Sequence, residues 1–141
     1  MVEYTGCSAD VLDDLKRIQS LMKKAARAAH TKIVASVFQP FDPQGVTGVV
    51  VVEESHLSIH TWPEHGYAAV DFFTCGDSLP ELAHAVLYEG LGAEQAEVML
   101  VDRGSRMPGD GIQIRSHRVQ GSEGSVPVVQ PLREARRQIA S

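Results

Sequence analysis

Apolar side chains recur every three or four residues from about Ala9 to Ala29, which is the spacing of one face of an α-helix. Aspartates lie near the start of this stretch and basic residues near its end, so the charges complement the helix dipole. Ser8 stands directly before the stretch and is suited to cap its first turn. The pattern therefore predicts one long helix close to the N-terminus.

After this helix the apolar period changes to two, which is typical of strands. The predicted strands are 32–38, 46–52, 56–62, 67–75 and 96–101, and a second helix is predicted at 78–91. Short connections between neighbouring strands favour antiparallel pairing. We therefore expect an α+β fold, a two-layer sandwich of a mainly antiparallel sheet with helices on one face.

The composition limits the domain organisation and the classes of partner. We expect residues 1–103 to form a single domain, and residues 104–141, which are rich in Gly, Pro and Ser, to form an irregular or mobile tail with a short helix suggested at 132–140. The 13 basic and 18 acidic residues give a net charge of −5, which argues against a broad nucleic-acid surface. No apolar run approaches the ~18 residues of a membrane span.

No signal peptide is recognisable at the N-terminus, so we expect a cytoplasmic protein. Cys7 and Cys75 are the two cysteines, and in such a compartment free thiols are expected instead of a disulfide.

One segment, 53–77, concentrates the side chains that carry chemistry. Its metal-ligating residues are His56, His60, His65 and Cys75. On a strand, His56 and His60 would stand ~13 Å apart, too far to bind one ion together, so no metal is expected. A hydrolytic nucleophile is also disfavoured, because Ser55 lies outside any G-x-S-x-G elbow.

A third interpretation concerns the peptide bond between Glu54 and Ser55. A serine hydroxyl can attack its own preceding carbonyl and turn the amide into an ester. Elimination then cuts the chain and leaves a dehydroalanine, which hydrolyses to a pyruvoyl cap with loss of ammonia. This chemistry needs a strained turn and a group that handles protons. A turn between two strong strands with His60 nearby meets these needs, but the triplet E-S-H alone is too weak to select this interpretation.

The segment 45–77 closely resembles the prokaryotic S-adenosylmethionine decarboxylase proenzyme family. The combination ESHLSIHTWPE and GYAAVDFFTCG is long and specific, and a looser resemblance runs from about Val2 to Val101. The resemblance implies a pyruvoyl-dependent decarboxylase that matures by cutting itself between Glu54 and Ser55. The products would be a β chain, residues 1–54, and an α chain that begins at the former Ser55.

The resemblance also implies roles in processing and catalysis. Ser55 would become the pyruvoyl group, which accepts electrons as CO2 leaves the substrate. His60 matches the histidine that assists self-processing, and Cys75 matches the acid that protonates the substrate α-carbon. Thr47 stands where the family more often has a processing serine, and its hydroxyl can make the same hydrogen bonds.

Three further residues match substrate-binding positions of the family. Glu64 would bind the ribose hydroxyls, Phe41 would stack on adenine, and His56 would contact the active site. A second adenine-stacking aromatic is expected near Thr5, where the nearest aromatic side chain is Tyr4. If Tyr4 faces the other side of the sheet, the adenosine pocket is incomplete.

The expected activity is conversion of S-adenosylmethionine to its decarboxylated form for spermidine synthesis. The runner-up is decarboxylation of L-arginine or L-ornithine on the same scaffold, because Glu64 can also pair with a cationic side chain. A third alternative is a non-processing binding subunit. From the family, two cleaved protomers should pair through their sheets into an α2β2 homodimer of αββα arrangement.

Overall fold

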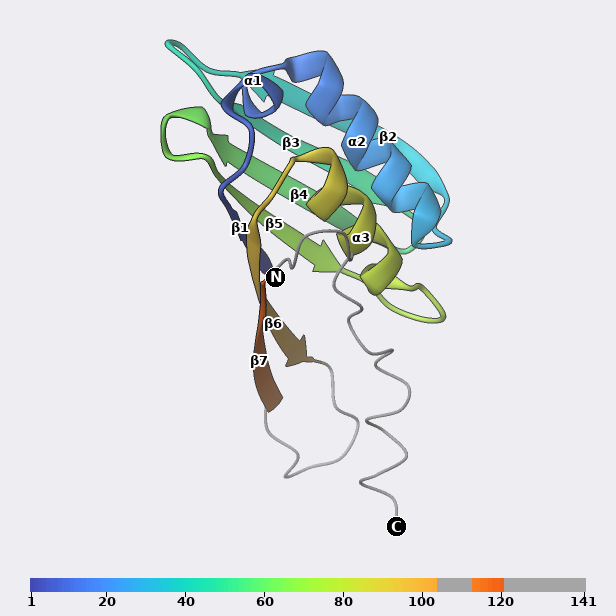
Figure 1. Cartoon of the computed structure of the whole chain (residues 1–141). Coiled ribbons are helices and arrows are strands. Elements are labelled where there is room, and N and C mark those ends of the chain that lie inside the picture. Colours follow the sequence, from blue (N-terminus) through green and yellow to red (C-terminus); the bar gives the residue numbers. More distant parts are fainter. Residues whose placement is uncertain (104–112, 121–141) are drawn as a thin grey trace.

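Within residues 1–103 and 113–120, which the computed structural model describes, seven strands form one sheet (Figure 1). The strands are β1 (Val2–Thr5), β2 (Ile33–Pro40), β3 (Val46–Val52), β4 (Ser55–Trp62), β5 (Tyr67–Phe73), β6 (Gln95–Asp102) and β7 (Gln113–Gln120). Their order is β2-β3-β4-β5-β1-β6-β7, and all neighbours are antiparallel. The strand nearest the N-terminus therefore lies inside the sheet, between β5 and β6.

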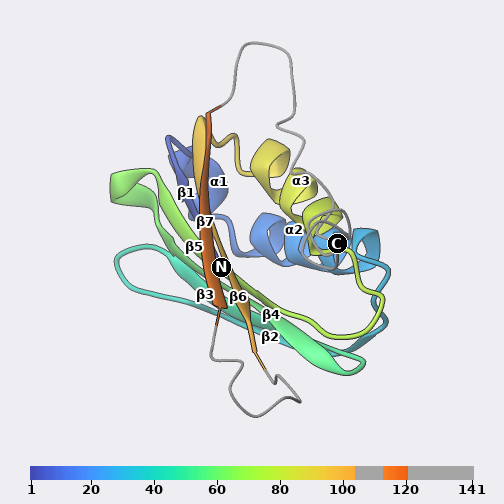
Figure 2. The same ribbon diagram turned by 90° about the horizontal axis from the view of Figure 1, so that it is seen from below.

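The two longer helices cover one face of this sheet (Figure 2). The helices are α1 (Ala9–Leu12), α2 (Leu15–Ala28), the 3-10 helix η1 (Pro63–His65) and α3 (Pro80–Gly90). This arrangement confirms the predicted α+β sandwich with helices on one face. No helix of the described residues is long and apolar enough to cross a bilayer.

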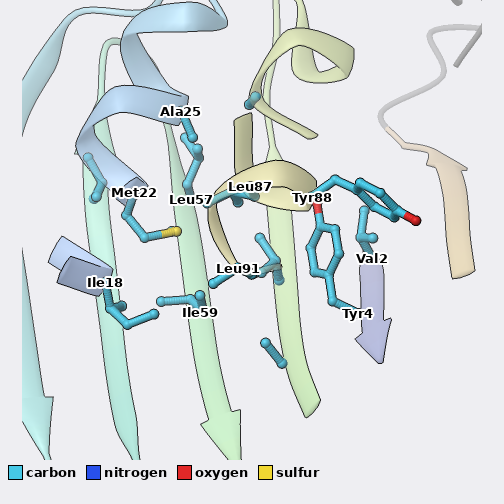
Figure 3. Packing of buried hydrophobic residues seen from close by; sticks show 14 of the residues in the cluster. Val2, Tyr4, Ile18, Met22, Ala25, Leu57, Ile59, Leu87, Tyr88 and Leu91 are labelled. Atoms are coloured by element: carbon cyan, nitrogen blue, oxygen red, sulfur yellow. The ribbon is translucent and has the colours of Figure 1, made fainter. Parts of the chain in front are cut away.

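The core lies between the helices and the central strands (Figure 3). Ile18 and Met22 of α2 are fully buried, as are Leu57 and Ile59 of β4 and Leu87 of α3. On β4 the buried residues alternate with the exposed His56, His60 and Trp62, because successive side chains of a strand point to opposite faces. The sheet thus has an apolar face under the helices and a second face that presents polar and aromatic side chains.

The N-terminal helix differs from the prediction, because it is broken at Asp13 and Asp14. The Asp14 side chain accepts a hydrogen bond from the Arg17 backbone N–H at 3.0 Å and so caps α2. Asp13 Oδ1 accepts from the Gly45 N–H at 2.9 Å. Aspartate side chains that bind backbone groups compete with a continuous helix. Ser8 does stand at the cap position of α1, but its side chain makes no capping bond.

Two strands were not predicted. β1 has only four residues, too few to display a period, and its burial comes from β5 and β6 on its two sides. β7 pairs with β6, so the expectation of an irregular chain after residue 103 is wrong for Gln113–Gln120. The helix suggested at 132–140 lies outside the described residues. The domain boundary at residue 103 stays a prediction.

Thr61 links three elements beneath the exposed face of β4. Its buried hydroxyl donates to the Leu12 carbonyl at 2.8 Å and accepts from the Val46 N–H at 2.8 Å. The side chain therefore ties α1 and the start of β3 to β4. A buried hydroxyl with both bonds made stabilises the fold, whereas its loss leaves two backbone groups unpaired.

We predict that Thr61→Val lowers the free energy of unfolding by about 1–3 kcal/mol, because the unpaired Leu12 carbonyl and Val46 N–H must then stay buried. Urea denaturation followed by circular dichroism measures this change. The matched control is Thr5→Val at an exposed position of β1, which should change stability by less than about 0.5 kcal/mol. Equal effects of the two substitutions would contradict the linking role of Thr61.

Candidate active site

Ser55 is the first residue of β4 and follows a tight connection from β3. Val52 pairs with Ser55 across the hairpin, so only Glu53 and Glu54 form the turn. Lys32 holds this turn from the neighbouring strand end, because its Nζ lies 2.8 Å from Glu53 Oε1 and its carbonyl accepts from the Glu53 N–H at 2.9 Å. The hydrogen bond to Glu53 raises the pKa of Lys32. The turn that precedes Ser55 is therefore anchored on both its side chain and its backbone.

The half-buried Ser55 hydroxyl hydrogen-bonds to the carbonyl oxygen of Phe73 on β5. Phe73 is the last residue of β5, and Cys75 lies two residues further on, in the loop that leads to α3. The Cys75 thiol donates to the Glu54 carbonyl oxygen over an Sγ–O distance of 3.7 Å. Ser78 Oγ in turn donates to the Cys75 carbonyl at 3.2 Å. The fold thus brings the exposed thiol against the carbonyl of the Glu54–Ser55 peptide bond, which is the predicted cleavage site.

A cavity of about 630 Å³ adjoins Cys75. It lies between the loop after β5, the start of α3 and the ends of β1 and β6. The wall contains Phe72 and Val98 as apolar groups and His84 of α3 as a buried polar group. Nothing in the sequence pattern singles out His84, because an isolated histidine in a helix has no motif around it. The cavity offers space for a small molecule beside the thiol.

His60 and Thr47 lie away from this turn. They pair across β3 and β4 on the sheet face opposite the helices, with Thr47 Oγ1 2.9 Å from His60 Nδ1. His60 follows Ser55 by five residues, which is about 16 Å along an extended strand. The expectation that His60 lies near the cleavage turn of the same chain is therefore wrong. Both residues belong to the same extended strand, so the distance between them is set by its rise per residue.

His56 lies on the same exposed sheet face, at the end of β4 that contains Ser55. It pairs with Phe73, and the two rings are 5.6 Å apart between centroids. His60 instead neighbours Trp62, with ring centroids 6.3 Å apart. Among the described residues no group of His, Cys, Asp or Glu is arranged to hold a metal ion.

Glu64 and Phe41 lie at the far end of the sheet from Ser55. Glu64 belongs to η1, beyond the end of β4, and its Oε2 accepts from Gln44 Nε2 at 3.2 Å. It lines a second cavity of about 370 Å³, whose other acidic residues are Asp10, Asp13 and Asp14. Phe41 is an exposed residue just after β2. The length of β4 places both more than about 20 Å from Ser55 within one chain.

Tyr4, the nearest aromatic to the expected second stacking position, is fully buried under the helices. It is therefore unavailable to stack on a ligand at the exposed face. The two cysteines are both free, as predicted, with Cys7 buried and Cys75 exposed. Burial raises the pKa of the Cys7 thiol to about 12.

The sequence and the structure of this chain both match proteins of one family. The sequence profile of S-adenosylmethionine decarboxylase matches residues 1–104. A crystal structure of the adenosylmethionine decarboxylase of Aquifex aeolicus aligns with a TM-score of 0.61 and 30% sequence identity, over 88% of this chain and 90% of that one.

Curated relatives carry the name S-adenosylmethionine decarboxylase proenzyme. The protein of Carboxydothermus hydrogenoformans is 49% identical over 105 residues, which cover 74% of this chain and 83% of the relative. The protein of Pseudomonas paraeruginosa is also 49% identical over 105 residues, but these span only 66% of its length, just under two thirds. On the strength of the profile match and these identities, the chain belongs to the S-adenosylmethionine decarboxylase family.

Proposed function

We propose that this chain cuts itself between Glu54 and Ser55 and then decarboxylates S-adenosylmethionine. The observation that carries the proposal is the contact of the Cys75 thiol with the Glu54 carbonyl oxygen, 3.7 Å away. This contact places the proposed proton donor, Cys75, beside the peptide bond that is proposed to be cut. The substrate is taken from the names of the relatives, which do not favour the alternative of arginine or ornithine.

Self-cleavage uses the Ser55 hydroxyl as the nucleophile. The hydroxyl turns from the Phe73 carbonyl oxygen to the Glu54 carbonyl carbon, and the C–N bond is exchanged for a C–O bond. A thiol at the Glu54 oxygen stabilises the negative charge that develops there during attack. Loss of the Ser55 α-proton then expels the Glu54 carboxylate, and water releases ammonia from the new end. The products are a carboxylate at Glu54 and a pyruvoyl group at residue 55.

The residues around position 55 suit such a group, because its keto carbon would stand at the sheet end beside Cys75 and the adjoining cavity. When present, the pyruvoyl group would supply an electron sink for the α-carbon of the substrate. Cys75 would give its proton to that carbon after CO2 has left. Its exposure on a loop leaves the thiol accessible to substrate.

The separation of His60 and Thr47 from Ser55 supports a role for a second copy of the chain. The uncovered sheet face exposes several large apolar side chains, namely Val37, Val51, Trp62, Phe73 and Met99. Such a face is buried by association. Two sheets packed face to face with their strand ends reversed would carry His60 and Thr47 of one copy toward Ser55 of the other. We therefore propose an α2β2 homodimer with the processing residues shared between copies.

The same arrangement accounts for Glu64 and Phe41. Both lie at the sheet end opposite Ser55, so they would approach the pyruvoyl group only from the partner copy. There Glu64 would accept hydrogen bonds from the ribose hydroxyls, and Phe41 would stack on adenine. His56, beside Phe73 at the cleavage end, would contact the substrate from its own chain. A cytoplasmic location and a place in spermidine synthesis complete the proposal.

Ser55→Ala should abolish cleavage, because alanine has no hydroxyl to attack the Glu54 carbonyl. Intact-mass spectrometry of the wild-type protein should show two fragments, with the second one lighter by the groups lost when serine becomes pyruvoyl. The matched control is Ser58→Ala, three residues further along β4, which should cleave fully. A wild-type protein that remains one uncut chain after long incubation would refute self-processing.

Iodoacetamide in mildly alkaline buffer should alkylate Cys75 and lower CO2 release by at least about 100-fold, because the proposed general acid is blocked. Cys7 should stay unmodified, since it is buried and its pKa is raised to about 12. Peptide mapping identifies the modified residue, and the Cys75→Ser variant is the control for labelling. Full turnover of a protein alkylated at Cys75 would exclude the thiol as the proton donor.

Complementation between two inactive variants tests the shared site. Ser55→Ala and His60→Ala should each remain uncut when expressed alone. When they are expressed together, the mixed dimer holds one site with Ser55 of one chain and His60 of the other, so the His60→Ala chain should be cut. Mass spectrometry of differently tagged chains reports this. Absence of cleavage in a purified mixed dimer would place His60 outside the partner's site.

A further inference from the structure

His84 is a buried histidine whose second ring nitrogen has no partner. The residue is 3% exposed, and its Nδ1 lies 2.7 Å from the hydroxyl of Tyr4 on β1. The Tyr4 ring stacks on the imidazole, with centroids 5.5 Å apart, and Tyr88 lies edge-on at 6.0 Å. Nε2, the other ring nitrogen, is buried and makes no hydrogen bond among the described residues. Buried polar atoms without a partner are rare and costly.

The hydrogen bond to Tyr4 determines what Nε2 can do. The Tyr4 oxygen lies 2.7 Å from His84 Nδ1 and 3.5 Å from the His84 carbonyl, and we assign the phenol as the donor to the nearer acceptor, Nδ1. Nε2 then carries the ring proton and is a hydrogen-bond donor. Burial lowers the pKa of His84 to about 4 and raises that of Tyr4 well above its usual value. Near neutral pH the pair is therefore uncharged.

His84 lies in the wall of the 630 Å³ cavity that also contains Cys75. The charged groups along this cavity are Asp77, Glu81, Arg103 and the Met1 ammonium. Arg103 stacks over the Phe73 ring at 4.9 Å, and the Met1 ammonium donates to the Met99 carbonyl at 2.9 Å. His84 is the one cavity residue among the described ones with a buried, unpartnered donor. A ligand with a hydrogen-bond acceptor would satisfy it.

We propose that the cavity receives the α-carboxylate of the substrate and that the His84 Nε2–H donates a hydrogen bond to it. This inference rests on the proposed function. Cys75, which would protonate the α-carbon, lines the same cavity, and the carboxylate is bonded directly to that carbon. A carbon in reach of the Cys75 thiol therefore carries its carboxylate into the cavity or to its mouth. His84 becomes a substrate-binding residue, and Tyr4 positions it.

The chemistry of the wall suits a carboxylate that is about to leave. The pyruvoyl group at residue 55 would supply the electron sink for the pair released when the bond between the α-carbon and the carboxylate carbon breaks and CO2 departs. The α-carbon then takes the Cys75 proton, and solvent restores the thiol. Apolar groups such as Phe72 and Val98 solvate neutral CO2 better than a carboxylate. An uncharged N–H donor orients the carboxylate and stabilises it less than a fixed cation would.

His84→Leu removes the donor and is the direct test. It should raise the KM for S-adenosylmethionine about tenfold, the effect of one hydrogen bond to a charged group. It should leave the inhibition constant of the decarboxylated product within about twofold of wild type, because that product has no carboxylate. The melting temperature should fall, since leucine leaves the buried Tyr4 hydroxyl without its Nδ1 partner. His84→Gln, which keeps an N–H donor, should recover most of the affinity.

The control variant is Tyr88→Phe, which deletes a hydrogen bond of the same helix, from the Tyr88 hydroxyl to the Glu94 carbonyl at 2.8 Å, outside the cavity lining. It should change neither constant. The carboxylate site would be overturned if His84→Leu changed the KM for the substrate and the inhibition constant of the product by the same factor, or changed neither. If His84→Leu fails to fold, His84→Gln takes its place. A His84→Gln protein that has wild-type stability but binds substrate and product equally less tightly would also overturn the carboxylate site. Failure of the proposed function appears separately, as wild-type protein that neither cleaves nor releases CO2.

Discussion

The pairing register of the β3–β4 hairpin is the constraint on which the candidate site depends. Val52 lies opposite Ser55, so the serine stands at the very end of the sheet, directly after a two-residue turn. In this register Leu57 and Ile59 enter the core. A slip by one residue would turn both out to solvent and carry Ser55 away from Cys75. The burial of two apolar side chains therefore holds the peptide bond between Glu54 and Ser55 in place.

The length of β4 decides which residues can cooperate within one chain. Glu54, Ser55 and Cys75 meet at one end, whereas His60 and Glu64 lie toward or beyond the other. An extended strand cannot bring its two ends together, so in the proposed function a single copy holds two half-sites at opposite ends of its sheet. The same face carries exposed apolar side chains that a second copy would bury. In the proposal, packing of the two exposed sheet faces therefore both forms the dimer and completes the site.

Much of the fold was predictable because most elements are amphipathic. The second half of the long N-terminal helix, α3 and the strands β3 to β5 each bury one face, and their periods appear directly in the sequence. The break at Asp13 and Asp14 was missed because it depends on side-chain bonds to backbone groups. β1 was missed because four residues show no period, and only neighbours distant in sequence make it an interior strand.

The sequence by itself determined the type of most elements, the buried face of the amphipathic ones, and the motif around Ser55 and Cys75 that marks the family. These are local properties, encoded in residues a few positions apart. Only the tertiary structure decided that Cys75 contacts the Glu54 carbonyl, that His60 stays apart from Ser55, and that His84 lines the cavity. Such distances depend on strand order and helix placement, which arise from contacts between residues far apart in the chain.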